Sequence, residues 1–157
     1  MSAQITPAPV RRSVSVRTSA EHAFRVFTAD IGRWWPPSHH VGAAPYKENV
    51  LEPHAGGRWY EIGEDGSQCD WGKVLIWEPP TRLVLAWQLD AQYRFNPDFM
   101  TEVEVRFTAE APDRTRVDLE HRMLERYGEA AQRVIDAVGS PNGWGRVLQL
   151  FGEAAEA

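Results

Sequence analysis

The chain has 157 residues and a mass of 17.8 kDa, the size of one ordinary domain, which leaves no room for a second hydrophobic core. Apolar residues make up 43% of it and charged residues 25%, so it is too apolar for a disordered chain. Its 17 Lys and Arg stand against 22 Asp and Glu, and the net charge of -5 argues against a general affinity for nucleic acids.

Residues 1–9 contain two prolines among small polar residues and are predicted to be a loose tail, so the expected single domain spans residues 10–157. The segment from Met1 to Arg12 lacks the apolar stretch of a secretion signal, and no later run approaches the roughly 20 apolar residues of a membrane span. Cys69, the single cysteine, has no internal disulfide partner. We therefore expect a cytoplasmic protein without a membrane partner.

The first elements are predicted from alternation and from capping residues. Alternating valines predict a strand from Val10 to about Thr18. Ser19 precedes apolar residues at helical spacing, which predicts a short helix capped by its side chain. A second helical turn at residues 30–35 should end at Pro36-Pro37, because a proline forces the preceding residue toward extended geometry.

The middle of the chain predicts a meander of short antiparallel strands separated by turn residues. Asp65-Gly66 is typical of a tight hairpin, and Pro79-Pro80 predicts a further turn. The expected strands occupy residues 50–52, 58–62, 70–77 and 83–88.

The clearest hairpin joins residues 101–107 to residues 115–123, because apolar and charged residues alternate in both segments. One register places Glu104 opposite Arg122, whereas a shift by two residues sets Glu104 against Glu120. Opposite charges favour the first register, which we therefore predict.

The chain is predicted to end in helices. Residues 129–138 carry apolar residues on one side, and Ser140-Pro141 predicts an N-cap followed by proline in the first turn of the last helix. Trp144, Leu148 and Phe151 then form an apolar stripe. This helix is the element available to cover the apolar face of the sheet. The expected fold is α+β, a curved antiparallel sheet wrapped around a long C-terminal helix with two short helices after the first strand.

An ordered set of motifs spans nearly the whole chain: Phe24–Thr28, Trp34-Trp35-Pro36, Glu52-Pro53, Gly56–Glu61, Asp65-Gly66, Trp71-Gly72, Trp77–Pro80, Trp87-Gln88, Thr101–Val103, His121 and Gly143-Trp144. In this order they resemble the helix-grip domains related to START and to the birch pollen allergen, the SRPBCC superfamily, and within it the group named after the C-terminal domain of the activator of heat-shock-protein-90 ATPase. The resemblance implies a cavity between sheet and helix, in a superfamily that includes lipid carriers and polyketide cyclases. One departure is segment 126–140, which is longer and more helical than the family's usual link.

His121 is the most informative titratable residue. It lies on the buried face of its strand, opposite Val105 in the predicted register, and resembles the histidine that faces the cavity in this family. A neutral imidazole there could bind a ligand oxygen or take a proton. The alternative is a buried histidine bonded to a neighbouring backbone or hydroxyl group, and we favour this alternative.

Glu61 and Tyr60 are adjacent and must point to opposite faces of a regular strand. Either Trp59 and Glu61 or Arg58 and Tyr60 lie inside. An inward Glu61 beside His121 would form a carboxylate–imidazole pair for acid–base chemistry on an enolisable substrate such as a polyketide. The alternative is a salt bridge between Glu61 and an arginine of the strand.

Even numbers of residues separate Trp71 and Trp77 from Lys73, so all three would lie on one face of a regular strand. If that face is the outer one, the two indoles leave an apolar patch, and a homodimer through the sheet is the simplest account.

We expect no cofactor and no metal. His39 and His40 are adjacent and cannot readily share one tetrahedral ion, and His22 and His54 have no partner at ligand spacing. The glycines lack the spacing of a phosphate-binding loop.

The leading hypothesis is non-catalytic binding of a small hydrophobic molecule, aromatic or lipid-like, between the sheet and the last helix. The first alternative is a cyclase or hydratase that uses His121 with Glu61 or Tyr60. The second is a chaperone-associated or stress-related interaction module with an exposed aromatic surface. The predicted cavity walls are Phe24, Phe27, Trp34, Trp59, Trp87, Val103, Val105, Phe107, Leu119, Trp144, Leu148 and Phe151, with His121 as the polar contact.

Overall fold

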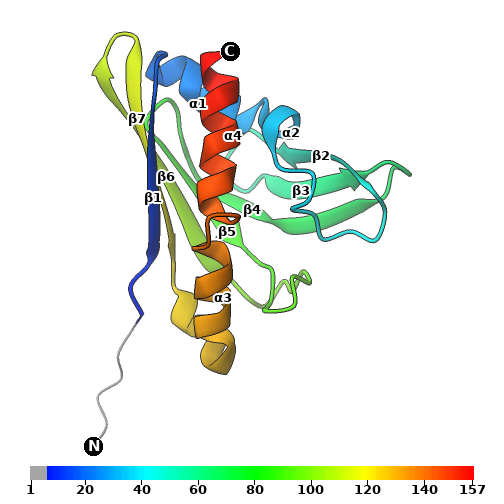
Figure 1. Cartoon of the computed structure of the whole chain (residues 1–157). Helices are drawn as coiled ribbons and strands as arrows, with labels where there is room; N and C mark the ends of the chain where they lie inside the picture. Colours follow the sequence, from blue (N-terminus) through cyan, green and yellow to red (C-terminus); the bar gives the residue numbers. More distant parts are fainter. Residues whose placement is uncertain (1–6) are drawn as a thin grey trace, which may run out of the picture.

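The computed structural model describes residues 7–157 and has one curled sheet of seven antiparallel strands, with a long C-terminal helix lying across it (Figure 1). The strands follow the order β1-β7-β6-β5-β4-β3-β2. This is the α+β helix-grip fold that the sequence predicts. Residues 1–6 of the predicted tail lie outside the described residues. The strands are β1 (Val10–Val16), β2 (Tyr46–Leu51), β3 (Arg58–Gly63), β4 (Gln68–Glu78), β5 (Arg82–Trp87), β6 (Thr101–Ala111) and β7 (Arg114–Arg122).

Two short helices connect β1 to β2 and pack against the last helix. The Ser19 hydroxyl accepts a hydrogen bond from the backbone N–H of His22 at 3.1 Å, which confirms the predicted cap. The second short helix ends just before Trp35 and the two prolines, as predicted. The helices are α1 (Ala20–Thr28), α2 (Ile31–Trp34), the 3-10 helix η1 (Leu124–Ala130), α3 (Ala131–Val138) and α4 (Trp144–Glu156).

The predicted register of the β6–β7 hairpin is wrong by two residues. Glu104 lies opposite Glu120, and Val103, not Val105, lies opposite His121. The turn pairs Ala111 with Arg114, which already differs by one residue from the predicted register, and an extra residue on β6 between Ala109 and Ala111 shifts the pairing by one more. Because the shift is an even number of residues, the apolar face stays inward.

Arg122 explains why two glutamates can lie opposite each other on this sheet. Its guanidinium donates to Glu104 at 3.0 Å, to Glu120 at 3.1 Å and to Glu102 at 2.9 Å. One diagonal arginine thus replaces the direct cross-strand pair that we expected, since long side chains reach diagonal neighbours on a sheet.

Trp71 and Trp77 both lie on the side of the sheet that faces the helices. β4 has two bulges, one at Trp71 and one at Leu75, and each reverses which face the following side chains point to. Trp71 and Trp77 therefore point inward, although Lys73 between them points outward and stays exposed. Trp71 is only 3% exposed, and Trp77 packs edge-on against Phe24 with ring centroids 5.0 Å apart. The homodimer expected through an outward face of these residues therefore loses its structural basis, and the oligomeric state stays a prediction.

The last helix begins at Trp144, so the predicted cap at Ser140-Pro141 is wrong. The Ser140 hydroxyl donates to the carbonyl oxygen of Ala137 at 2.7 Å, and the Gly143 N–H donates to the Ser140 carbonyl at 2.9 Å. These bonds close a turn between α3 and α4 instead of starting the helix. The predicted helix at 129–138 is the end of η1 followed by α3.

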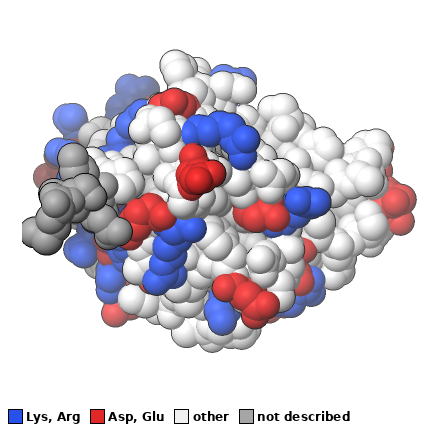
Figure 2. Space-filling model, turned by 90° about the horizontal axis from the view of Figure 1, so that it is seen from below, with Lys and Arg blue, Asp and Glu red and all other residues white. Residues whose placement is uncertain are grey.

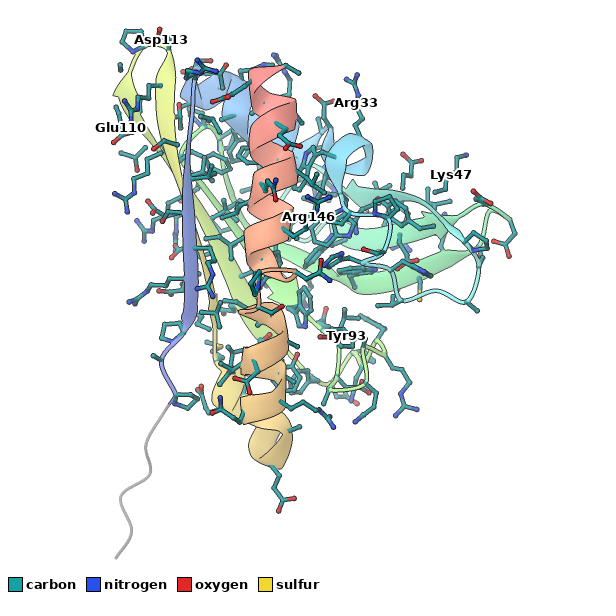
Figure 3. The ribbon with its side chains drawn as sticks, viewed as in Figure 1. Arg33, Lys47, Tyr93, Glu110, Asp113 and Arg146 are labelled. Carbon is teal, nitrogen blue, oxygen red and sulfur yellow. The ribbon has the colours of Figure 1, made fainter. Side chains whose placement is uncertain are left out.

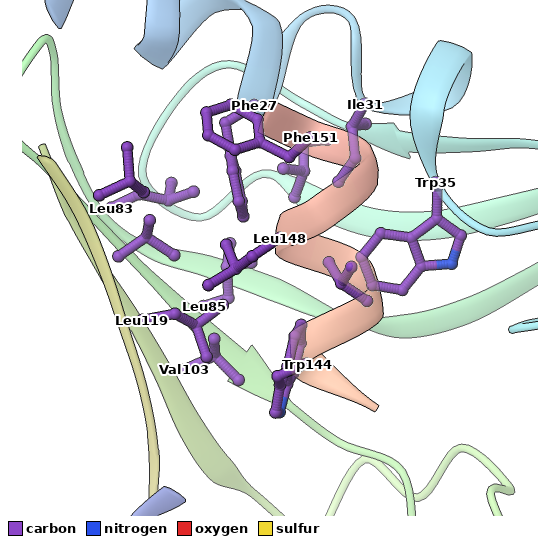
Figure 4. Close-up of a cluster of buried hydrophobic side chains, with 14 of the residues drawn as sticks. Phe27, Ile31, Trp35, Leu83, Leu85, Val103, Leu119, Trp144, Leu148 and Phe151 are labelled. Carbon is purple, nitrogen blue, oxygen red and sulfur yellow. The ribbon is translucent and has the colours of Figure 1, made fainter. Parts of the chain in front are cut away.

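The core lies between the inner face of the sheet and α4 (Figure 4). Leu148 and Phe151 of α4 pack toward Leu85, Val103 and Leu119 of the sheet. Within residues 7–157, no helix combines the length and the apolar character needed to cross a bilayer.

Candidate functional site

The space under the C-terminal half of α4 is filled by aromatic rings. Phe27 lies 5.3 Å from Trp34 and 5.2 Å from Phe151, and Trp34 lies 5.5 Å from Phe151, all measured between ring centroids. Most of the predicted cavity walls therefore belong to the buried core. The walls placed in the core are Phe24, Phe27, Trp34, Trp59, Val103, Val105, Phe107, Leu119, Leu148 and Phe151.

A pocket of about 420 Å³ opens instead at the N-terminal end of α4. Of the predicted wall residues, Trp87 and Trp144 line it. Figure 3 shows Tyr93 on the loop between β5 and β6, at the same end of the molecule as α3. We call this space the α4 pocket. Its lining residues are Trp35, Ser38, His39, His40, Val41, Trp71, Trp87, Tyr93, Ala137, Val138, Ser140, Asn142, Gly143, Trp144 and Val147.

Four indoles, those of Trp35, Trp71, Trp87 and Trp144, form a closed circuit at the base of the α4 pocket, which we call the tryptophan wall. Successive ring centroids lie 5.3, 5.7, 5.5 and 6.2 Å apart, with interplanar angles of 83°, 83°, 64° and 75°. These are edge-to-face contacts, the arrangement that aromatic quadrupoles favour. Each of the four indoles is only 3–6% exposed, so the wall is rigid and closely packed.

Segment 126–140, the departure from the family pattern, supplies part of the opposite wall through Ala137, Val138 and Ser140. No Lys, Arg, Asp or Glu is among the described residues that line the α4 pocket. Figure 2 shows the molecule from below, with basic and acidic side chains interspersed over this end. Nothing in this charge distribution selects an ionic ligand.

The loop at residues 36–42 forms the rim of the α4 pocket and is fixed at three points. Trp35 Nε1 donates to the carbonyl oxygen of His39 at 2.9 Å. His39 Nε2 lies 2.6 Å from the carbonyl oxygen of Asn142, which ties the loop to the α3–α4 turn. The backbone N–H groups of Val41 and Gly42 donate to the Glu61 carboxylate at 2.6 and 3.1 Å.

Glu61 points inward with Trp59, so the structure decides between the two sets that the sequence left open. Its side chain is 2% exposed, and besides the two loop amides it accepts a hydrogen bond from Trp71 Nε1 at 2.8 Å. Tyr60 lies on the other face, with the Arg58 guanidinium 4.0 Å from its ring centroid. Arg58 pairs with Asp70, so the predicted salt bridge of Glu61 with a strand arginine is not formed.

His121 is fully buried and lies outside the lining of the α4 pocket. Trp144 Nε1 donates to its Nδ1 at 3.0 Å, and its Nε2 lies 2.9 Å from Thr101 Oγ1. Because an indole nitrogen only donates, Nδ1 holds the lone pair and Nε2–H donates to Thr101. Burial lowers the pKa of His121 to about 3, so the ring is neutral.

The favoured alternative for His121, a buried histidine bonded to a hydroxyl group, therefore describes the structure. The predicted pair of Glu61 with His121 is not formed, because each group is bonded elsewhere. His121 instead fixes the orientation of Trp144, one member of the tryptophan wall.

The ionisable side chains that do line the α4 pocket are His39, His40 and Tyr93. His40 Nδ1 lies 3.0 Å from the carbonyl oxygen of Gly42 and 4.0 Å from Glu61 Oε2. Sequence reasoning considered these histidines only as metal ligands, and their position just after the Trp-Trp-Pro-Pro motif was the available signal. Across residues 7–157, no three His, Cys, Asp or Glu side chains are grouped to hold a metal ion.

Comparisons with known proteins agree with the fold. Residues 17–156 match the family model described as activator of Hsp90 ATPase homolog 1-like protein. No curated protein matches the chain. Txn09, solved with a ligand designated SUM and described as an anthrahydroquino-gamma-pyrone synthase, is 38% identical over 95% of this chain and 97% of its own, with a TM-score of 0.67.

A second solved structure is CalC from Micromonospora echinospora, described as a self-sacrificing resistance protein. It is 32% identical over 94% of both chains, with a TM-score of 0.71. A protein from Nitrosomonas europaea shares only 14% identity over 94% of both chains, with a TM-score of 0.62, and this likeness shows the fold alone.

Proposed function

The chain belongs to the family of activator of Hsp90 ATPase homolog 1-like proteins, and from that premise we propose that it binds a small, flat, uncharged aromatic molecule in the α4 pocket. The observation that carries the proposal is the tryptophan wall, four indoles that border one space of about 420 Å³. Pockets for drug-sized molecules occupy about 300–1,000 Å³ and are mostly apolar with a few polar groups. The α4 pocket has this size and this composition.

Flat ligands suit this pocket better than lipid chains do. The four indoles, each 3–6% exposed, are rigid aromatic groups that a flat ring system can meet edge-on or by stacking, and such aromatic pairs contribute about 0.5–1.5 kcal/mol each beyond the area they bury. A flexible acyl chain would forgo these contacts and lose conformational entropy on binding.

The relative Txn09 supports a more specific ligand class. Its description as an anthrahydroquino-gamma-pyrone synthase names a fused-ring quinol joined to a pyrone, and it is 38% identical to this chain over nearly its whole length. We therefore propose that the ligand of this chain is a fused-ring aromatic of the quinone, quinol or pyrone class.

The alternative of an interaction module has less support. It requires an exposed aromatic surface, and in the described part of the chain Tyr93 is the only strongly exposed large hydrophobic residue. Because Tyr93 also lines the α4 pocket, its exposure fits a ligand contact at the rim.

Titration of the protein with 1,8-dihydroxyanthraquinone, followed by tryptophan fluorescence, tests the proposal. We expect saturable quenching at a 1:1 ratio, and none with palmitate. Ala137→Phe should fill the pocket and weaken binding by about tenfold or more, with a change in unfolding free energy of only about 0.5 kcal/mol because the residue is exposed. Gln132→Phe, on the exposed side of the same helix, is the matched control. Absence of quenching, or equal effects of the two variants, would contradict the proposal.

A further inference from the structure

The two adjacent histidines at the rim of the α4 pocket are bonded differently. His39 uses both ring nitrogens: Nε2 lies 2.6 Å from the carbonyl oxygen of Asn142, and Nδ1 lies 3.1 Å from Ser38 Oγ. A carbonyl oxygen only accepts, so Nε2 carries the hydrogen and Nδ1 accepts from the serine hydroxyl. His39 is therefore occupied in holding the loop to the α3–α4 turn.

His40 keeps one nitrogen available. Its Nδ1 lies 3.0 Å from the carbonyl oxygen of Gly42, so Nδ1 carries the hydrogen and the lone pair of the neutral ring is at Nε2. Across residues 7–157, no protein group forms a hydrogen bond with that lone pair. The side chain lines the α4 pocket and is 34% exposed.

Glu61 stands behind His40 as a fixed, buried carboxylate. Its Oε2 lies 4.0 Å from His40 Nδ1, on the side of the ring away from the free lone pair. Three N–H donors, from Val41, Gly42 and Trp71, hold the carboxylate in place. A carboxylate at this distance attracts an imidazolium, and its burial limits screening by salt.

On these contacts, and resting on the proposed function, we propose that His40 is the proton acceptor of the α4 pocket and that the bound aromatic carries an acidic phenol or enol hydroxyl. The ligand O–H donates to Nε2. When the proton transfers, the O–H bond breaks, an Nε2–H bond forms and the electron pair stays on the ligand oxygen. The phenolate or enolate then faces an imidazolium that is balanced by Glu61, and no further reactant is required.

The histidine that lies beside the Glu61 carboxylate is His40, and not His121. His121, which the sequence offered as one possible partner of Glu61, is buried and bonded on both sides. His40 shares the carboxylate and is the one of the two that lines the pocket.

The experiment compares 2-hydroxyanthraquinone with 2-methylanthraquinone, which has nearly the same shape and no hydroxyl group. The visible absorption of the hydroxy compound moves to longer wavelength when its hydroxyl ionises, so proton transfer is visible directly. At a pH where the free dye is neutral, we expect the wild-type protein to produce this red shift and to bind the hydroxy compound about tenfold more tightly than the methyl compound.

Two variants separate proton transfer from hydrogen bonding. His40→Gln keeps a neutral acceptor and should bind the hydroxy compound without the red shift. His40→Asn keeps the donor to the Gly42 carbonyl, lacks the distal nitrogen and should bind both compounds equally. His54→Gln, at an exposed histidine in the turn between β2 and β3, should behave as wild type. Thermal unfolding checks that each variant is folded.

A red shift retained in His40→Gln, or equal binding of the two compounds by the wild-type protein, would overturn the assignment of His40 and leave the proposed function standing. Failure of the wild-type protein to bind either compound would overturn both.

Discussion

The two halves of α4 cover the same sheet and carry the same apolar stripe, yet one half is packed solid and the other borders a pocket. Under the C-terminal half, Phe27, Phe151 and Trp34 pack ring to ring in the buried core. Under the N-terminal half, Trp144 and Trp35 belong to a wall beside about 420 Å³ of space. The number of aromatic residues alone therefore does not decide whether the space between α4 and the sheet contains a pocket.

The difference lies in the residues that face the rings. Three indoles of the tryptophan wall donate hydrogen bonds to fixed acceptors: Trp35 to the His39 carbonyl, Trp71 to Glu61 and Trp144 to His121. Trp34 in the packed half is held in the same way, by a 2.7 Å hydrogen bond from its Nε1 to the Val26 carbonyl oxygen, so hydrogen bonds alone do not distinguish the two halves. Small residues on the facing segment, such as Ala137 and Gly143, leave the space unfilled. The comparison indicates a pocket preorganised by polar contacts, which lowers the entropic cost of binding.

The largest expected effect is a loss of stability from a substitution in the packed half of α4. Phe151→Ala removes a fully buried ring and should lower the unfolding free energy by about 3–5 kcal/mol, because it leaves a cavity among rings that cannot collapse completely. Urea denaturation measures it. Binding of 1,8-dihydroxyanthraquinone under native conditions should change by less than about twofold. Gln149→Ala, at an exposed position of the same helix, is the control. A large loss of binding in Phe151→Ala would show that the packed half of α4 and the half that borders the pocket are not independent.

A smaller loss of stability is expected from a substitution that loosens the rim of the α4 pocket. Glu61→Gln replaces a carboxylate that accepts three N–H bonds with an amide whose nitrogen cannot accept, and should lower the unfolding free energy by about 2–3 kcal/mol. Amide hydrogen exchange at Val41 and Gly42 should accelerate, because these groups lose their acceptor. Glu64→Gln, in the exposed turn after β3, is the control. Unchanged exchange in Glu61→Gln would contradict the role of the carboxylate in fixing the loop.

The smallest expected effect is a pH dependence of stability that arises from His121, the acceptor of the Trp144 indole N–H. The pKa of His121 is about 3 in the folded protein and 6.5 in an ordinary environment, so the unfolded chain binds a proton between these values and the folded protein does not. The unfolding free energy should therefore fall as the pH falls, by about 2 kcal/mol from pH 6.5 to pH 5.

Denaturant unfolding at a series of pH values between 5 and 6.5 measures this dependence. His121→Gln should remove most of it, whereas His54→Gln should retain it because His54 is exposed in the folded protein. A wild-type protein whose stability stays constant over this range would contradict the assignment of a buried, neutral His121.

The sequence predicted whatever depends on regular periodicity. Alternation placed His121 and Trp87 on the inner face, helical spacing placed Trp144 there, and Ser19 marked the start of α1. These assignments are robust because an even shift of register leaves the face of a strand unchanged.

What the sequence could not predict arises at irregularities. Bulges in β4 turned Trp71 and Trp77 inward, and the irregularity near Ala109 moved the register of the β6–β7 hairpin. The backbone donors to Glu61 lie on a loop with no periodicity, so the sequence pattern did not predict that His40 lies beside this carboxylate. The pocket itself depends on small residues such as Ala137 and Gly143 lining the space beside the tryptophan wall, and periodicity does not predict this.

The most direct test of a pocket bordered by the tryptophan wall is the set of indole N–H resonances in a ¹H–¹⁵N NMR spectrum, recorded while 2-hydroxyanthraquinone is added. The indole resonances of the tryptophan wall should shift together through the ring current of the ligand, while that of Trp77, which packs against Phe24 and does not line the α4 pocket, stays in place. Shifts centred on Trp77, or none at the four wall indoles, would contradict the account.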